Sequence, residues 1–116
     1  MKTYHGSCHC GKVAYDVEAD FTEGMRCNCS HCKRKGFLLA FVPLDHFHLL
    51  SGADNLTTYH FNKHHIDHTF CQTCGVQSFA KGHDGNGNYM VMINLNCLED
   101  FDTTKIKIGE YDGASA

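Results

Sequence analysis

The sequence predicts a single small domain, residues 1–116, that is mainly β and consists of short antiparallel strands with cysteine-bearing turns. Three observations lead to this prediction. The chain has 116 residues, which favours one domain and leaves no room for a separate cofactor domain of ordinary size. Short apolar segments alternate with Gly-containing turns, and none has the length and period of an amphipathic helix. The chain also contains 8 Cys and 10 His, an unusual number of potential metal ligands.

The predicted strands follow from hydrophobic patterning. Residues 12–19 carry Val13, Tyr15 and Val17 at alternate positions, which is typical of a half-buried strand. Residues 37–42 form a continuous apolar run that ends before Pro43, as expected of a strand buried on both faces. Further strands are predicted at residues 47–50, 56–61, 65–70, 76–80, 89–95 and 105–111.

Composition limits the functions that the chain can have. The formal net charge is -3, which argues against a nucleic acid or an anionic membrane as the main partner. The first residues lack the apolar stretch of a secretory signal, and the longest apolar run, residues 37–44, is too short to span a bilayer. We therefore expect a reduced, cytoplasmic location, where closely spaced cysteines are more often metal ligands than disulfides.

Seven of the eight cysteines fall into three closely spaced groups, namely Cys8 and Cys10, Cys27, Cys29 and Cys32, and Cys71 and Cys74. Spacings of one or two residues let both sulfurs of a pair face one ion, and a Gly after Cys10 and after Cys74 suits the positive φ of such turns. The pair Cys71 and Cys74 lies between the predicted strands 65–70 and 76–80, so we expect it to occupy a hairpin loop. Two pairs would complete one closed, structural zinc site with the ligands Cys8, Cys10, Cys71 and Cys74.

The remaining triplet is Cys27, Cys29 and Cys32. It predicts a second zinc site with three protein ligands and an exchangeable fourth position, which is the pattern of a reactive zinc. Alternatively, His31 or His9 supplies the fourth ligand and the site is structural. Iron is the alternative metal, and a disulfide framework is the alternative to metal binding.

The other cysteine and the histidines give weaker signals. Cys97 is expected to be a buried free cysteine at the end of a strand. In the histidine-rich stretch, alternation places His64 and His68 on one face of a strand, and His68 lies near Cys71 in the sequence. Partly exposed strand positions are expected for His60, His64 and His65.

Three segments together resemble the glutathione-dependent formaldehyde-activating family, which includes the centromere protein V domain. They are Gly-Ser-Cys-His-Cys-Gly at residues 6–11, Cys-Asn-Cys-Ser-His-Cys-Lys-Arg-Lys-Gly at residues 27–36, and Phe-Cys-Gln-Thr-Cys-Gly at residues 70–75. The resemblance implies a tent-like β fold with a structural zinc on the four paired cysteines and a second zinc on the triplet, beside a glutathione site. It also implies a carbon–sulfur lyase-type reaction that joins glutathione and formaldehyde into S-hydroxymethylglutathione.

The second site agrees with this chemistry, because a thiol that coordinates zinc loses its proton and becomes a nucleophile. We expect the partners to be a small thiol such as glutathione and a small aldehyde, with His31 or water as the proton donor for the new alkoxide. The basic run at residues 33–35 could attract the carboxylates of glutathione. A zinc-stabilised binding module and a redox- or metal-responsive protein are the alternatives. Exposed strand edges would also allow a homodimer.

Overall fold

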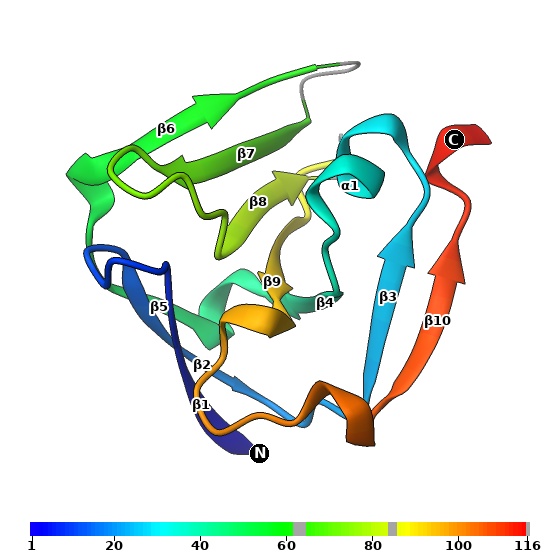
Figure 1. Ribbon diagram of the computed structural model, residues 1–116, viewed down its shortest axis with the longest axis horizontal. Helices are drawn as coiled ribbons and strands as arrows, with labels where there is room; N and C mark the ends of the chain where they lie inside the picture. Colours follow the sequence, from blue (N-terminus) through cyan, green and yellow to red (C-terminus); the bar gives the residue numbers. More distant parts are fainter. Residues whose placement is uncertain (62–64, 84–85, 116) are drawn as a thin grey trace.

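Two β-sheets share the main hydrophobic core of the chain (Figure 1). The computed structural model describes residues 1–61, 65–83 and 86–115. In this part of the chain the smaller sheet has the order β1-β2-β5, with β1 (Lys2–Ser7), β2 (Ala14–Ala19) and β5 (Phe47–Ser51). The larger sheet has the order β10 (Lys107–Tyr111), β3 (Glu23–Cys27), β4 (Leu39–Pro43), β9 (Tyr89–Asn94), β8 (Phe79–His83), β7 (Ile66–Cys71) and β6 (Leu56–Tyr59).

Helical structure is confined to single turns and one short helix within the described ranges. The α-helix α1 spans Ser30–Lys35. The 3-10 turns are η1 (Leu44–His46), η2 (Ala53–Asn55), η3 (Leu95–Cys97), η4 (Thr103–Lys105) and η5 (Gly113–Ser115). In these ranges the structure contains no helix of the length and apolar character needed to cross a membrane.

The predicted mainly β class is confirmed, and most of the expected strands are present. Strand pairing is antiparallel except between β10 and β3, which run parallel. Hydrophobic patterning did not predict β1, β3 or α1. A six-residue helix is too short to show a 3.6-residue period, and patterning does not report which distant strand a segment pairs with.

Two predicted strands differ from the structure in an informative way. The run at residues 37–42 was predicted to be buried on both faces, but Phe41 is 44% exposed, while Leu39 and Val42 are buried. That prediction was wrong because one side of β4 at Phe41 is left uncovered. The strand expected at residues 76–80 begins only at Phe79, because the carbonyl of Val76 still accepts a hydrogen bond from the Cys71 backbone N–H and closes the cysteine turn.

The residues that lead into β9 include the dipeptide Asn86-Gly87. Gly87 has φ of 87°, a conformation typical of glycine in such a dipeptide. The neighbouring dipeptide Asp84-Gly85 lies outside the described residues, as does His64.

Tyr15 joins the two sheets. Its side chain is fully buried, with ring centroids 5.0 Å from Phe47 and 5.8 Å from Phe79. Its hydroxyl donates a hydrogen bond of 3.1 Å to the Ser78 carbonyl, so the polar end of this core residue is satisfied. Tyr15 on the small sheet is therefore fixed against the segment that leads from the second cysteine pair into β8.

The close contact of β3 with the core gives a test of this packing. A Cβ at Gly24 would lie 2.9 Å from Leu38 and 3.0 Å from both Leu95 and Ile106. We expect Gly24→Ala to lower the free energy of unfolding by about 1–3 kcal/mol, because the added methyl overpacks the core. Urea titration at a fixed metal concentration measures this change.

Gly109 on the neighbouring strand β10 is the matched control, because a Cβ there would meet nothing within 4 Å. Gly109→Ala is expected to change the free energy of unfolding by less than about 0.5 kcal/mol. Equal effects of the two substitutions would contradict the packing described for β3.

Candidate functional site

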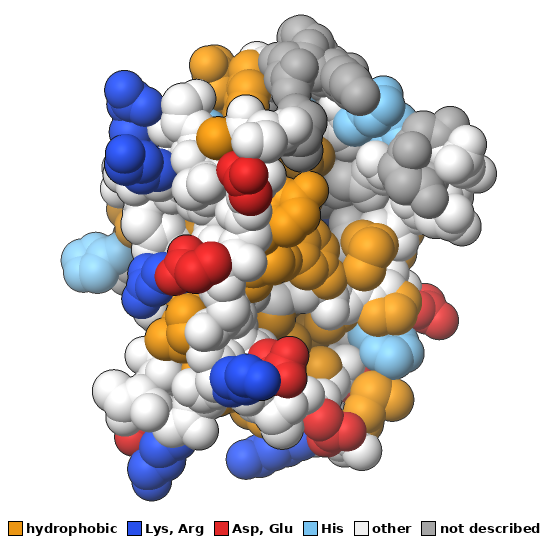
Figure 2. Space-filling model, turned by 90° about the vertical axis from the view of Figure 1, so that its right-hand side faces the viewer, with side chains coloured by type: hydrophobic (Ala, Val, Ile, Leu, Met, Phe, Trp, Pro, Cys, Tyr) orange, Lys and Arg blue, Asp and Glu red, His pale blue; other side chains and the backbone are white. Residues whose placement is uncertain are grey.

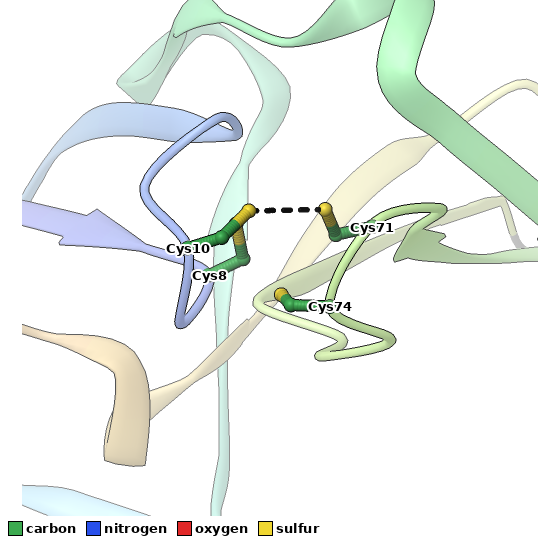
Figure 3. Close-up of side chains that lie close together, drawn as sticks. All are labelled: Cys8, Cys10, Cys71 and Cys74. Carbon is green, nitrogen blue, oxygen red and sulfur yellow. Dashed lines mark hydrogen bonds between the residues drawn. The ribbon is translucent and has the colours of Figure 1, made fainter.

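The two cysteine pairs meet as one compact cluster of sulfurs (Figure 3). The Sγ atoms of Cys8, Cys10, Cys71 and Cys74 all lie within 4.8 Å of one another. Cys10 Sγ is 3.6 Å from Cys8 Sγ and 3.6 Å from Cys71 Sγ. Four sulfurs bound at about 2.3 Å to a tetrahedral zinc lie about 3.8 Å apart, so these spacings fit a metal ion.

Local backbone conformation aims these sulfurs. Gly11 and Gly75 have φ of 83° and 79°, as the Gly after each pair predicted. The Cys8 and Cys71 backbone N–H groups each donate a hydrogen bond of 3.0 Å to a carbonyl five residues later, which closes each turn. The second turn connects the antiparallel strands β7 and β8, which confirms its predicted place in a hairpin loop.

The surroundings of the cluster act differently on its cysteines. At Cys10 the hydrogen bond from the Lys12 backbone N–H lowers the pKa, but desolvation and hydrogen bonds with the neighbouring thiols outweigh it and raise the pKa to about 11. Hydrogen-bond donors favour thiolates elsewhere in the cluster. The Val13 backbone N–H donates to Cys8 Sγ at 3.4 Å, and the Asn55 side-chain amide donates to Cys71 Sγ at 3.3 Å. The hydrogen bond from the Cys74 backbone N–H lowers the pKa of Cys71 to about 6. Cys8 and Cys71 are buried, and all eight cysteines lie in the described part of the chain and are free. The cluster could therefore hold a metal ion with four sulfur ligands.

The predicted triplet also comes together. The Sγ atoms of Cys27, Cys29 and Cys32 lie within 4.8 Å of one another, and each residue is partly buried. Cys27 ends β3, Cys29 is the N-cap of α1, and Cys32 lies in that helix. Backbone N–H groups donate from Cys29 to Cys27 Sγ at 3.5 Å and from Cys32 to Cys29 Sγ at 3.3 Å. These three sulfurs could hold a second metal ion.

The chemistry of the triplet is not uniform. Burial raises the pKa of Cys32. Burial would also raise the pKa of Cys29, but hydrogen bonds from the Cys32 backbone and from neighbouring thiols outweigh it, and the pKa of Cys29 is lowered. Of the described residues, neither His31 nor His9 joins this sulfur cluster. The alternative in which one of these histidines completes a four-ligand site is therefore not supported by the geometry.

The C-terminal segment is held beside the triplet. Asn28, between the first two of its cysteines, donates through its side chain to Asp112 Oδ1 at 3.0 Å and accepts from the Ala114 backbone N–H at 2.9 Å. A Cβ on Gly113 would collide with Cys27 Sγ. Sequence analysis missed this contact, because it depends on the parallel pairing of β10 with β3.

The triplet lies in the wall of a cavity of about 510 Å³. The cavity is lined by Cys27, Cys29 and Cys32 together with Met25, Leu39, Phe41, Phe61, His65, Ile66, His68, His83, Met92, Tyr111 and Gly113. These residues lie in or next to β3, α1, β4, β6, β7, β8, β9, β10 and η5, which are spread over most of the chain. The sequence alone placed only the cysteines of this set at the site, since single apolar residues in strands carry no signal for a cavity.

His68 is the buried histidine among those described. It is 5% exposed. His60 and His65 are not buried, as expected, but the prediction that they lie in a strand was wrong, because β6 ends at Tyr59 and β7 begins at Ile66. The ring centroid of His68 is 4.4 Å from that of His31 and 4.9 Å from that of Phe61. The Nδ1 atoms of His68 and His31 are buried and have no hydrogen-bond partner. His68 lines the cavity, while His31, the predicted proton donor, is not among its described lining residues.

Two other predictions from the sequence can be placed. Arg34 Nη1 donates to the Ser30 carbonyl at 2.9 Å, and Lys35 Nζ lies 5.3 Å from the centre of the Phe70 ring. The basic run is thus placed at the last turn of α1 and is absent from the described cavity lining. Cys97 is only partly buried, contrary to expectation, because it lies in η3 after the end of β9; burial raises its pKa to about 11.

Comparison with known proteins identifies the family. The model of the glutathione-dependent formaldehyde-activating enzyme family matches residues 3–111. The chain belongs to this family. It is also similar to the crystal structure of a Rhodobacter sphaeroides protein, with 32% sequence identity and a TM-score of 0.81. That match covers 92% of this chain and 99% of the other. The resemblance stated from the three cysteine segments is thereby confirmed, and the cysteine clusters of this family member are compatible with metal binding.

A substitution in the four-cysteine cluster tests whether this cluster binds a metal ion. We expect Cys71→Ser to remove one equivalent of metal and to lower the free energy of unfolding by more than about 4 kcal/mol, because metal binding at a four-sulfur site is coupled to folding. Elemental analysis and chemical denaturation measure the two effects. Cys97→Ser, outside both clusters, is the control and should retain all metal. Unchanged metal content in Cys71→Ser would contradict the role of the first cluster.

The buried His68 predicts a pH effect. Burial, with the nearby His31, lowers the pKa of His68 from 6.5 to about 4. Between these values the unfolded chain binds a proton that the folded chain does not. This side chain therefore reduces stability as the pH falls below about 6.5, by up to about 1.4 kcal/mol per pH unit. NMR titration of the His68 ring protons should give a midpoint near the lower value, and a midpoint near that of free histidine would contradict it.

Proposed function

We propose that the chain is a zinc-dependent carbon–sulfur lyase-type enzyme that condenses glutathione or a related thiol with formaldehyde to give S-hydroxymethylglutathione. The observation that carries this proposal is the triplet. In a chain of this family, three partly exposed cysteine sulfurs within 4.8 Å of one another line a cavity of about 510 Å³. A sulfur cluster that opens into a cavity is suited to a small thiol, whereas a closed cluster is suited to structure alone.

The four-cysteine cluster is proposed to hold the structural zinc. Its spacing of 3.6 Å between adjacent sulfurs, the burial of Cys8 and Cys71, and the N–H donors on its sulfurs support this role. Four protein ligands complete a tetrahedral zinc and leave no position for a substrate. This cluster would therefore stabilise the fold and take no part in the reaction.

The triplet is proposed to hold the second zinc, with Cys27, Cys29 and Cys32 as ligands. A zinc ion at this position would lower the pKa of an incoming thiol, so that the thiolate predominates at neutral pH. The chain itself would confine the thiol and the aldehyde in one cavity and reduce the access of water. The all-sulfur ligand sets suit zinc and also iron, so the choice of zinc rests on the family to which the chain belongs.

The reaction itself requires only the formation of one bond and the transfer of one proton. The thiolate sulfur bonds to the carbonyl carbon, the π electrons move to oxygen, and that oxygen takes up the proton that the thiol released. Side chains that could deliver it are those of His65, His68, His83 and Tyr111, which line the cavity with the cysteines. Because His31 is packed behind His68, we assign it to positioning of that ring.

A cytoplasmic location, as expected from the sequence, would supply glutathione and keep the cysteines reduced. The alternatives, a binding module and a redox- or metal-responsive protein, share the zinc sites but predict no acceleration of adduct formation. A metal-responsive protein would instead release the triplet's zinc on oxidation, because thiolate ligands are lost.

The proposal is tested on the triplet. We expect Cys29→Ser to lose the second zinc and to slow adduct formation from glutathione and formaldehyde at least about 100-fold, beyond the effect of losing a residue that only supports a ligand. Elemental analysis gives the zinc content, and NMR exchange spectroscopy gives the rate above the uncatalysed reaction. Cys97→Ser is the control. Equal activity of Cys29→Ser and the intact protein would contradict the proposed role of the triplet.

A further inference from the structure

Away from the cysteines, the wall of the cavity is largely apolar. Half of the fourteen lining residues are apolar or aromatic side chains other than cysteine, namely Met25, Leu39, Phe41, Phe61, Ile66, Met92 and Tyr111. They come from β3, β4, β7, β9, β10 and the segment after β6. The face of the molecule drawn in Figure 2 is hollowed along its centre, where hydrophobic side chains gather. An apolar surface of this kind in a concave site favours a ligand that carries apolar groups.

Two of these side chains are left largely uncovered. Phe41 is 44% exposed on the interior strand β4, and Tyr111 is 48% exposed at the end of β10. Met25 and Met92 lie in the same wall, and the flexible thioether side chains of methionine adapt to irregular apolar ligands. Because exposed apolar surface is unfavourable in water, a ligand that covers these rings gains binding free energy.

The size of the cavity excludes formaldehyde as the group that fills it. The volume of about 510 Å³ lies within the range of about 300–1,000 Å³ typical of sites for organic ligands. Formaldehyde has one carbon and one oxygen, so its adduct would leave the apolar wall uncovered. The second reactant can therefore carry a substituent of several carbons.

Glutathione is a poor match for this wall. It carries two carboxylates and one ammonium group, and a charge placed against apolar side chains is costly unless it is paired. Within the described cavity lining the residues that can become cationic are histidines, and His65 and His83 lie with their ring centroids 4.7 Å apart. The charged groups of glutathione would face these imidazoles or solvent. The side chains of Phe41 and Met92 would then be available to contact the substituent of the aldehyde.

We propose that the enzyme acts on larger apolar aldehydes, whose hydrocarbon or aromatic substituent binds against Met25, Phe41, Met92 and Tyr111. This proposal rests on the thiol–aldehyde chemistry proposed above and names its substrate class. The thiol sulfur bonds to the carbonyl carbon of R–CHO, and the thiol proton ends on the former carbonyl oxygen, giving R–CH(OH)–S–R'. The atoms balance without an oxidant or a reductant.

The test compares two aldehydes with glutathione and the zinc-loaded protein. NMR exchange spectroscopy measures adduct formation from formaldehyde and from 3-phenylpropanal, and each rate is divided by the uncatalysed rate for the same aldehyde. We expect this acceleration to be at least about tenfold greater for 3-phenylpropanal, since one added apolar group in a fitting site changes specificity by about 10–200-fold. If adduct formation is accelerated for formaldehyde with no preference for 3-phenylpropanal, the proposed substrate class is overturned and the proposed function stands.

A matched pair of variants locates the preference. Phe41→Ala should reduce the ratio of the two accelerations at least about fivefold, because its ring lies in the cavity wall. Leu50→Ala is the control, because Leu50 is 56% exposed on β5 and is absent from the described lining. Equal ratios in the two variants would contradict the assignment of the wall.

Binding of an unreactive analogue separates this inference from the proposed function. With 3-phenylpropan-1-ol, we expect shifts of the methyl NMR signals of Met25 and Met92 that are weakened in Phe41→Ala. If these shifts occur but adduct formation is accelerated for neither aldehyde, the proposed function fails and the apolar ligand site stands. If the alcohol causes no shifts, or if sedimentation shows a dimer that Phe41→Ala dissociates, the apolar wall is covered by other means and the inference is overturned.

Discussion

The structure depends on the meeting of four cysteine sulfurs from two turns that are more than 60 residues apart, Cys8 and Cys10 with Cys71 and Cys74. The first turn connects strands of the small sheet, and the second connects β7 with β8 of the large sheet. A domain of this size buries a modest apolar core, so a metal ion on these four sulfurs would cross-link the two sheets and supply stability that the core alone does not. Tyr15, which is buried between the sheets and contacts Phe79, is a second link between them.

Strand β7 connects this structural cluster to the cavity. Cys71 ends the strand with its sulfur in the closed cluster, while Ile66 and His68 near its start line the cavity with the cysteine triplet. Fixing the end of β7 therefore also fixes one wall of the site. On the other side, the pairing of β10 with β3 and the hydrogen bonds of Asn28 hold the C-terminal segment beside Cys27. The cavity thus lies between two elements that are each fixed independently, and Phe41 on β4, a strand between them in the sheet, is left uncovered.

The sequence was most informative where chemistry depends on local spacing. Cysteines one or two residues apart and followed by Gly11 or Gly75 determine their own turn, so the two clusters could be grouped without a structure. The positions of Phe41, Met25, Met92 and Tyr111 in the cavity wall could not be predicted, because they depend on which distant strands become neighbours. The same limit explains the wrong expectation for residues 37–42. Hydrophobicity indicates that a strand is buried somewhere, whereas only the order of strands in the sheet decides which face remains open.

Anomalous diffraction at the zinc edge from crystals of the intact protein would locate the metal ions directly. We expect one zinc about 2.3 Å from each of the four sulfurs of Cys8, Cys10, Cys71 and Cys74. We expect a second zinc on the sulfurs of Cys27, Cys29 and Cys32, with its fourth ligand a water or an added thiol on the cavity side. A disulfide within either cluster, or a protein side chain as the fourth ligand of the triplet, would show that the cysteines do not form these two zinc sites.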